Sequence, residues 1–356
     1  MGEGKSKKKW VMAVLAVLLA AGILVSFLLG RYPVPPGALL GILFDRLLRG
    51  AEKLVRLVFP GIPPGWGIAP FWEERMETVA LRIRMPRILL ACLVGCCLST
   101  AGASYQGVFQ NPMAAPDILG ATSGAAFGAA LAILLGGNSR IITLSAFLFS
   151  LLTMVLALLI SRTASGKRVL TLVLSGIMVS SLFNAGTSYI KLVADPSNQL
   201  PAITYWLMGS LSGAEGKTVG AVILPMVLGI LPLLLLRWRI NVITLGDEEA
   251  RTIGVNAGLV RTVVILCSTL ITAASVSVSG MIGWVGLVIP HLSRKLIGSD
   301  HRGLLPCSML TGAAFLLLVD DVSRNLLAVE IPIGILTAVV GAPFFLYLIT
   351  RKEKTI

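Results

Sequence analysis

Charged residues are scarce in this sequence. Only 13% of its 356 residues are Asp, Glu, Lys or Arg, whereas about a quarter of the residues in soluble proteins are charged. Hydrophobic residues make up 56% of the chain, and the mean hydropathy is +0.88. This balance excludes a soluble globular domain, and we expect an integral membrane protein.

Residues that carry out catalysis or bind metals are also few. The two histidines, His291 and His301, have neither a second histidine four residues away nor an adjacent cysteine, so we expect no metal site there and a hydrogen-bonded structural role for His291. The five cysteines lie in apolar stretches without metal-ligand spacing, which favours a packing role. The segment 213–218 ends in Gly-Lys-Thr but lacks the first glycine of a phosphate-binding loop. We therefore expect no catalytic residue, metal site or cofactor in this chain.

Long apolar runs recur from one end of the sequence to the other. A helix needs about 20 apolar residues to cross the hydrocarbon core of a membrane, and we count about ten such runs. They lie near residues 11–29, 88–107, 118–135, 141–160, 170–190, 219–236, 259–278, 285–297, 304–319 and 333–349. The first run is longer than the apolar core of a secretory signal, so we expect a retained helix. The sequence predicts an all-α, polytopic bundle that forms one domain over residues 1–356.

Basic residues are distributed unevenly between the connecting segments. With the N-terminus inside, the inner segments hold most of the lysines and arginines. One long segment apart, the outer segments hold only Arg140, Lys191, Lys217 and Arg324. Cytoplasmic loops of membrane proteins carry such an excess. This pattern predicts that both termini are cytoplasmic, and it accounts for the net charge of +13 without a nucleic-acid partner.

The segment 31–87 is the exception, because it is external in this scheme although it is rich in basic residues. Its length is close to the limit of about 60 residues beyond which charge counting loses force. Proline and glycine are frequent within its portion 46–72. We expect a long external segment with a short amphipathic helix resting on the membrane, followed by a loop.

The stretch Ser279–Arg294 contains residues that break helices. Glycines, a proline and a histidine interrupt what should be a lipid-spanning helix. An unpaired backbone amide costs several kcal/mol in hydrocarbon, so a broken helix is tolerated only where it is buried in protein or lines a watery path. The pattern predicts that this protein transports a substrate.

Three acidic residues, Asp320, Asp321 and Glu330, lie within or beside the predicted spans. Charge at bilayer depth is rare and is usually functional. These carboxylates either relay protons or lie at a helix end, paired with Arg324 near the outer surface. We favour the second interpretation.

The inner stretch 241–255 differs from an ordinary loop. Its acidic residues 247–249 suit the N-terminus of a helix, and Leu245, Ala250 and Ile253 offer an apolar edge. This pattern predicts a short surface helix that either contacts a partner or lies on the membrane.

Spaced motifs between about residues 81 and 348 resemble one family of membrane proteins. The motifs are Arg84-Met85-Pro86-Arg87, Gln110-Asn111-Pro112-Met113-Ala114, Leu174-Ser175-Gly176, Trp206-x2-Gly209-Ser210, Leu245-Gly246-Asp247, Val285-Gly286-Leu287-x2-Pro290-His291 and Glu330-x-Pro332-x-Gly334. Together they resemble the permease subunits of type II ABC importers, the FecCD/BtuC-like family that imports ferric siderophores, haem and cobalamin.

The resemblance implies a transmembrane permease domain in the plasma (inner) membrane, with about ten helices in each of two identical subunits. It also implies two cytoplasmic ABC ATPase subunits, which bind the ATP and magnesium, and an extracytoplasmic substrate-binding protein. The segment 238–258 matches the coupling-helix segment of the family. The residues that would contact the ATPase are Leu245, Gly246, Asp247, Glu248, Ala250, Arg251 and Gly254.

The same resemblance assigns residues to docking and to the pathway. Arg84 and Arg87 match arginines that pair with glutamates of the binding protein, and Arg324 lies one position away from a third. Charged contacts at such a rim steer and orient docking. The residues expected in the pathway and its cytoplasmic gate are Asn111, Pro112, Met113, Gly280, Gly283, Gly286 and Pro290.

The identity of the substrate stays open at this stage. A metal chelate is the leading hypothesis, either a ferric siderophore or cobalamin, with haem less favoured. Molybdate and tungstate importers share the architecture. A different alternative is a stand-alone proton-coupled transporter that uses Asp320, Asp321 or Glu330.

Overall fold

The protein is a bundle of helices, and no strand occurs in the part of the chain that the structure describes. A computed structural model describes residues 2–59, 63, 65–163 and 168–350. The helices are α1 (Gly2–Leu28), α2 (Pro36–Val58), α3 (Glu74–Thr78), the π-helical η1 (Val79–Arg84), α4 (Met85–Val108), α5 (Ala121–Leu134), α6 (Ser139–Thr163), α7 (Arg168–Val193), α8 (Gln199–Met208), α9 (Gly216–Ile243), α10 (Asp247–Thr252), α11 (Ala257–Ser279), α12 (Val285–Ile297), α13 (His301–Asn325) and α14 (Ile333–Thr350).

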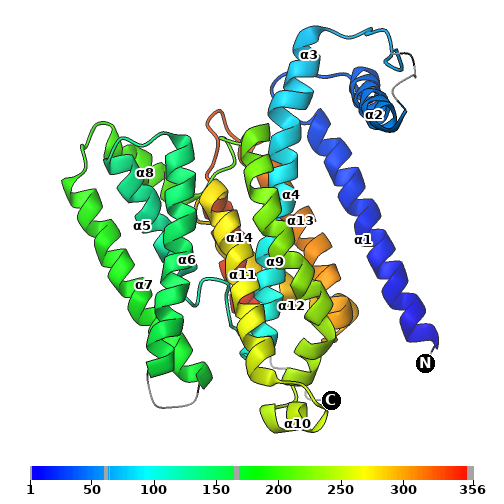
Figure 1. Ribbon diagram of the computed structural model, residues 1–356. Helices are drawn as coiled ribbons and strands as arrows, with labels where there is room; N and C mark the ends of the chain where they lie inside the picture. Colours follow the sequence, from blue (N-terminus) through cyan, green and yellow to red (C-terminus); the bar gives the residue numbers. More distant parts are fainter. Residues whose placement is uncertain (1, 60–62, 64, 164–167, 351–356) are drawn as a thin grey trace.

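The long helices run side by side, as a membrane-spanning bundle requires (Figure 1). Seven helices in the described ranges are long and apolar enough to cross a membrane, and α5 and α14 are also apolar but shorter. Each of the ten predicted spans corresponds to a helix, so the all-α polytopic fold class is confirmed. The first residues of α1 and the last residues of α14 lie at the end of the bundle that carries α10, opposite α2, α3 and α8 (Figure 1).

Helix α4 lies at the centre of the bundle and is buried along most of its length. It packs against α13, α11, α12 and α9. A Cβ atom at Gly95 would overlap the carbonyl of Gly312 on α13, and one at Gly102 would overlap the carbonyl of Gly286 on α12. Membrane helices associate through such small residues because lipid provides no hydrophobic force between them.

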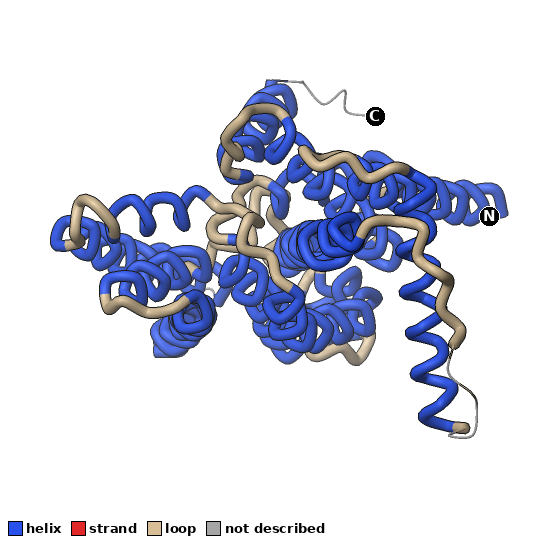
Figure 2. Tube along the Cα trace, turned by 90° about the horizontal axis from the view of Figure 1, so that it is seen from above, coloured by secondary structure: helices blue, strands red, loops and turns tan. Residues whose placement is uncertain are grey.

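A second group of helices, α5 to α8, lies beside this central group (Figures 1 and 2). Gly128 on α5 faces Ser145 on α6, whose hydroxyl donates a hydrogen bond of 2.7 Å to the Gly128 carbonyl. Phe127, Phe149 and Phe183 join α5, α6 and α7 through edge-to-face ring contacts. The two groups meet where α11 packs against α5 and α6.

Helical structure extends into two of the predicted connecting segments. The helix that begins at Glu74 continues without a break to Val108, so the final part of the segment 31–87 is helical. Similarly, α9 extends to Ile243 and α11 begins at Ala257, which shortens the predicted segment 238–258 at both ends. Helices extend further than apolar runs alone indicate, because polar residues at a span's end lie beyond the hydrocarbon.

The close contact between α4 and α12 allows a test of the packing. We expect Gly102→Ala to lower the free energy of unfolding by about 1–3 kcal/mol, because the new methyl group displaces the backbone of Gly286. Gly220→Ala is the matched control, since no atom lies within 4 Å of its Cβ position on α9. Melting in detergent, followed by fluorescence, measures both variants. Equal melting temperatures for the two variants would contradict the packing described here.

Candidate functional site

The helix broken at 280–284 brings three distant segments of the chain together. Helix α11 ends at Ser279, and α12 begins at Val285. The Ser210 amide donates a hydrogen bond of 2.8 Å to the Ser279 carbonyl, and the Ile333 amide donates one of 2.9 Å to the Gly209 carbonyl. Three segments therefore meet here: the one after α8, the end of α11 and the one before α14. They satisfy some of one another's backbone hydrogen-bonding groups.

Glycine is required where these three segments meet. Gly209 and Gly280 have φ angles of +75° and +67°, which side chains rarely adopt. A Cβ at Gly280 would overlap the Trp206 carbonyl, and a Cβ at Gly334 would lie 2.9 Å from the Met281 carbonyl. The glycines allow the backbone to approach to contact distance.

The first turn of α12 is supported from the neighbouring helix α4. The Gln106 side-chain amide donates to the carbonyls of Gly286 and Leu287 at 3.3 and 3.5 Å. Trp284 precedes this turn with a φ of +68°, which is unusual for a residue other than glycine. Its indole packs against Gly341 of α14 and has an edge contact with Phe345. Helix α12 is thus held on two sides.

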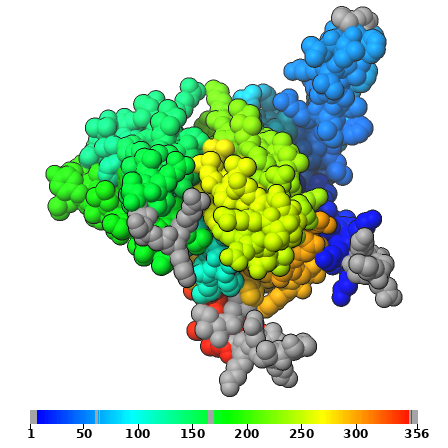
Figure 3. Space-filling model, turned by 60° about the horizontal axis from the view of Figure 1, so that its bottom comes forward, coloured from blue at the N-terminus to red at the C-terminus, as the bar shows by residue number. Residues whose placement is uncertain are grey.

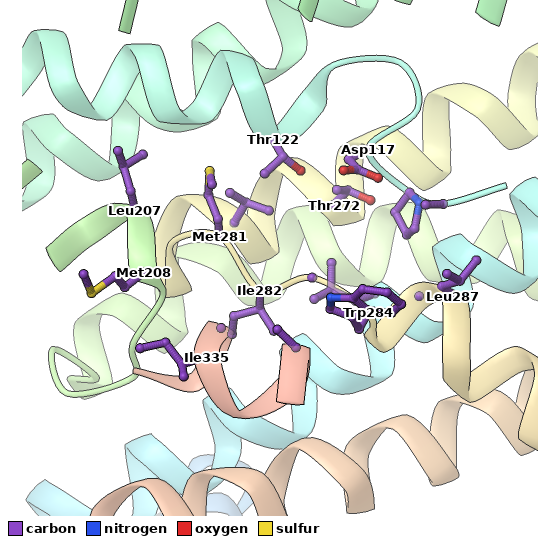
Figure 4. Close-up of a pocket in the computed structure, with 18 of the residues that line it drawn as sticks. Asp117, Thr122, Leu207, Met208, Thr272, Met281, Ile282, Trp284, Leu287 and Ile335 are labelled. Carbon is purple, nitrogen blue, oxygen red and sulfur yellow. The ribbon is translucent and has the colours of Figure 1, made fainter. Parts of the chain in front are cut away.

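A cavity of about 680 Å³ opens beside the broken helix (Figure 4). Its walls come from the connection between α4 and α5, from the end of α8, from the break itself and from α14. The lining is mostly apolar, and it includes Gly283 and Gly286 from the predicted pathway. A volume in this range is typical of sites that enclose a small molecule.

Asp117 is the one charged side chain among the described residues that line this cavity. It follows the predicted gate segment and is exposed to the cavity, near Thr122 and Thr272 and away from Met208 and Ile335 (Figure 4). Enclosure by surrounding protein raises the pKa of Asp117, and its own backbone amide offsets this only in part. The charged form therefore lacks full compensation, which a cation or a hydrogen-bond donor would supply.

The other predicted pathway residues do not line this cavity. Gly280 packs against the end of α8, and Pro290 is buried inside α12. Asn111 lines a second cavity of about 370 Å³, next to Val169 and Leu170 at the start of α7. Pro112 and Met113 are exposed on the same connection, where the Met113 amide donates a hydrogen bond of 2.9 Å to the Asn111 side chain. Their gating role stays a prediction.

A network of charged residues ties α4, α13 and the connection before α14 together at the α2 end of the bundle. The Arg87 guanidinium donates to both carboxylate oxygens of Asp320 and to both of Glu330, at 2.8–3.1 Å. Arg324 contacts Asp321 and donates a hydrogen bond of 2.8 Å to the Ser26 carbonyl of α1. The three acidic residues are therefore paired with arginines, as expected. Arg87, and not Arg324, is the main partner of two of them, Asp320 and Glu330.

The three arginines expected to dock the binding protein are buried in this region. Arg84, Arg87 and Arg324 are 4–8% exposed. Arg84 donates hydrogen bonds of 2.6 Å to the Phe27 and Tyr32 carbonyls. All three also line a cavity of about 240 Å³ at the α2 end. Within this chain Arg84 and Arg324 bind backbone carbonyls of α1, and Arg87 binds Asp320 of α13. Docking by the three arginines stays a prediction.

Helix α10 lies at the opposite end, near the centre of the face that Figure 3 brings forward. Arg261 of α11 donates a hydrogen bond of 2.8 Å to Asp247 and anchors the start of this short helix. Leu245 and Ile253 are 66% and 52% exposed, whereas Ala250 is fully buried. The expectation that Ala250 forms part of the apolar edge was therefore wrong, because this residue packs against its own chain.

No group of metal-binding side chains occurs among the residues that the structure describes. The Asn241 side-chain oxygen lies 2.9 Å from Nδ1 of His301 and accepts a hydrogen bond of 2.8 Å from the His301 amide. This contact links the end of α9 to the start of α13, so His301 has a structural role.

Several lining residues were not identified from the sequence. Asp117 lay between recognised motif positions without a pattern of its own, and the positive φ of Trp284 has no sequence signal. The contributions of α8 and α14 were partly indicated by the sequence, because their motifs at Trp206 and Gly334 were recognised. Only the folded chain shows that both helices line one cavity.

Comparisons with known proteins agree with this architecture. A sequence model of the FecCD transport family matches residues 17–351. The molybdate import system permease of Haemophilus influenzae is 42% identical over 78% of this chain and 82% of its own. The cobalamin import system permease of Halobacterium salinarum is 36% identical over 99% of both chains.

A solved structure shares the fold as well as the sequence. It is described as an ABC transporter of the metal-chelate type in an inward-facing conformation, and it is 37% identical to this chain. The two superpose with a TM-score of 0.82 over 96% of this chain and 99% of the other. The chain therefore belongs to the FecCD transport family and is a multi-pass membrane permease of an ABC-type importer.

Proposed function

We propose that this permease imports a neutral or cationic metal chelate, such as a ferric siderophore or cobalamin, into the cytoplasm. The observation that carries the proposal is the cavity beside the broken helix, whose walls are mostly apolar and whose charge comes from Asp117. Its volume admits part of a bulky ligand and leaves space for more on the open side. Apolar walls of this kind make few directional demands on a ligand, which suits such a cargo.

Charge argues against an oxyanion. A doubly charged molybdate ion would lose its hydration in an apolar cavity and would meet the Asp117 carboxylate, and both effects are unfavourable. Molybdate nevertheless remains the second candidate, because a permease for molybdate is among the most similar relatives. The charge at residue 117 separates the two candidates.

A proton-coupled mechanism has less support. Asp320, Asp321 and Glu330 form ion pairs with Arg87 and Arg324, and none of the three lines the large cavity. These residues therefore suit a structural role at the outer end of the bundle.

The energy for transport would come from partner subunits. Two copies of this chain would form the pathway, two cytoplasmic ATPases would bind at α10, and a binding protein would deliver the chelate at the α2 end. In this arrangement both termini lie in the cytoplasm and the protein resides in the inner membrane. ATP binding would favour one of two conformations through contacts at Leu245 and Ile253, which are the exposed apolar residues beside α10.

The ATPase contact can be tested by charge. We expect Leu245→Glu to weaken association with the ATPase at least about tenfold, because a charge would enter an apolar interface. Leu135→Glu is the matched control, since this leucine is 76% exposed at the opposite end of the bundle. Co-purification and Kd measurements report the effect. Unchanged association of the Leu245 variant would remove α10 from the interface.

A structural role of the ion-pair network can be distinguished from a proton-relay role by experiment. We expect Asp320→Asn to lower the free energy of unfolding by about 1–3 kcal/mol, because Arg87 then keeps only Glu330 as a buried partner. Glu215→Gln, at an exposed position at the start of α9, should change the stability little. Uptake by the folded variant should still require ATP. Uptake that persists without the ATPase and collapses with a protonophore would favour the relay.

Substrate charge is tested by uptake into proteoliposomes that contain the permease with its ATPase and binding protein. We expect uptake of cobalamin or a ferric siderophore but not of molybdate. Asp117→Lys should reduce chelate uptake at least about tenfold, which corresponds to about 1.4 kcal/mol, and Asp117→Asn should reduce it less. Preferential molybdate uptake by the unmodified protein would refute the proposal.

A further inference from the structure

Helix α2 has an exposed apolar stripe that the bundle does not cover. Leu40, Phe44, Leu47, Leu54 and Val58 are each 55–69% exposed. With the exposed Ala51, they recur every three or four residues, which places all of them on one face of the helix. An apolar face of this extent is stable only in contact with a partner or with lipid.

The opposite face of α2 carries the charged residues. Arg46, Arg49, Lys53 and Arg56 are exposed and fall on the far side of the helix from the stripe. Asp45 lies 2.7 Å from Arg49, and Glu52 lies 3.6 Å from Arg56. The helix is thus fully amphipathic, and it is not among the helices apolar enough to span a membrane.

The chain's own contacts use the polar side of α2 and leave the stripe bare. The carboxylate of Asp45 accepts a hydrogen bond of 2.9 Å from the Ile68 amide, and that of Glu52 accepts one of 3.2 Å from the Trp66 amide. The rings of Phe71 and Trp72 lie against Gly41. The returning segment therefore covers the face opposite the apolar residues.

The orientation of α2 is that of a helix lying on a membrane. Figure 1 shows it nearly end-on, and Figure 2, turned by 90°, shows it lengthwise and pointing away from the bundle. Its axis is therefore nearly perpendicular to the spanning helices, and it lies level with the end of α1. A helix that is perpendicular to the spanning helices and lies at their end runs parallel to the membrane plane.

We propose that α2 lies in the membrane–water interface, with the apolar stripe among the acyl chains and the basic face toward water and headgroups. Lipid is the occupant because the helix lies in the plane of the boundary and its charges all lie on one side, as in interfacial helices. A protein partner would not require this orientation. The proposal does not depend on which substrate the permease carries.

The placement has a structural consequence for the outer end of the bundle. The connection between α1 and α2 contains Tyr32, whose carbonyl accepts a hydrogen bond from Arg84. Arg31 donates hydrogen bonds of 2.5 and 3.2 Å to Ala328 and Leu327, in the connection before α14. An anchored α2 restrains this connection, and therefore restrains the surroundings of the arginine cluster.

Nitroxide accessibility tests the proposal in lipid nanodiscs. Single labels are introduced by Leu47→Cys and Leu54→Cys on the stripe, and by Arg46→Cys and Lys53→Cys as neighbouring controls, after replacement of the five native cysteines. We expect the ratio of oxygen to water-soluble nickel accessibility to be several-fold higher at the two leucine positions. Nanodiscs with and without anionic lipid should both show this difference.

Two results would overturn the proposal. Equal nickel accessibility at all four positions would place α2 in water. Shielding of the stripe labels from both reagents would show a protein contact, either a second copy or another partner. If the cysteine-free chain does not fold, a photoreactive phospholipid is used with the unmodified protein. Adducts within 36–58 are then expected, and their absence, with adducts present on spanning helices, would refute the placement.

Discussion

The bundle depends on satisfying backbone groups where a helix is broken inside hydrocarbon. Unpaired amides at this depth cost several kcal/mol each, so the break after α11 requires nearby partners. The segments at Gly209, Ser279 and Ile333 supply part of these partners to one another. Glycines allow this approach, and the same approach leaves open the cavity that we assign to the substrate. The same close approach of the three segments thus pairs the backbone groups at the break and forms the cavity.

Buried charge serves a second purpose at the end that carries α2. Removing Arg87 from water is costly, and the cost is offset because Asp320 and Glu330 accept hydrogen bonds from all three of its guanidinium nitrogens. The partners come from distant parts of the chain, so the network requires α4, α13 and the connection before α14 to assemble in one way. Arg324 extends the same constraint to α1 through Ser26. Charges that resemble a proton path in the sequence therefore position helices in the fold.

The two ends of the bundle present different surfaces. At the α10 end, Leu245 and Ile253 are exposed beside a helix held by Asp247 and Arg261, which supports the ATPase contact that we propose there. At the other end, α2 presents an apolar stripe that suits lipid. In the proposed mechanism, the permease needs both a firm contact with its ATPase and a fixed position relative to the membrane. These two amphipathic elements can supply them.

The sequence by itself determined the class, the spans and the family, because apolar length and motif spacing are local properties. It also located the short helix α10 and the helix break. Only the tertiary structure decided that Asp117 and Trp284 line the cavity, that Ala250 faces inward, and that Arg87 joins two acidic residues. These facts depend on contacts between residues far apart in the chain. Helical periodicity defines the faces of each helix, but only packing selects which face meets lipid, protein or the open path.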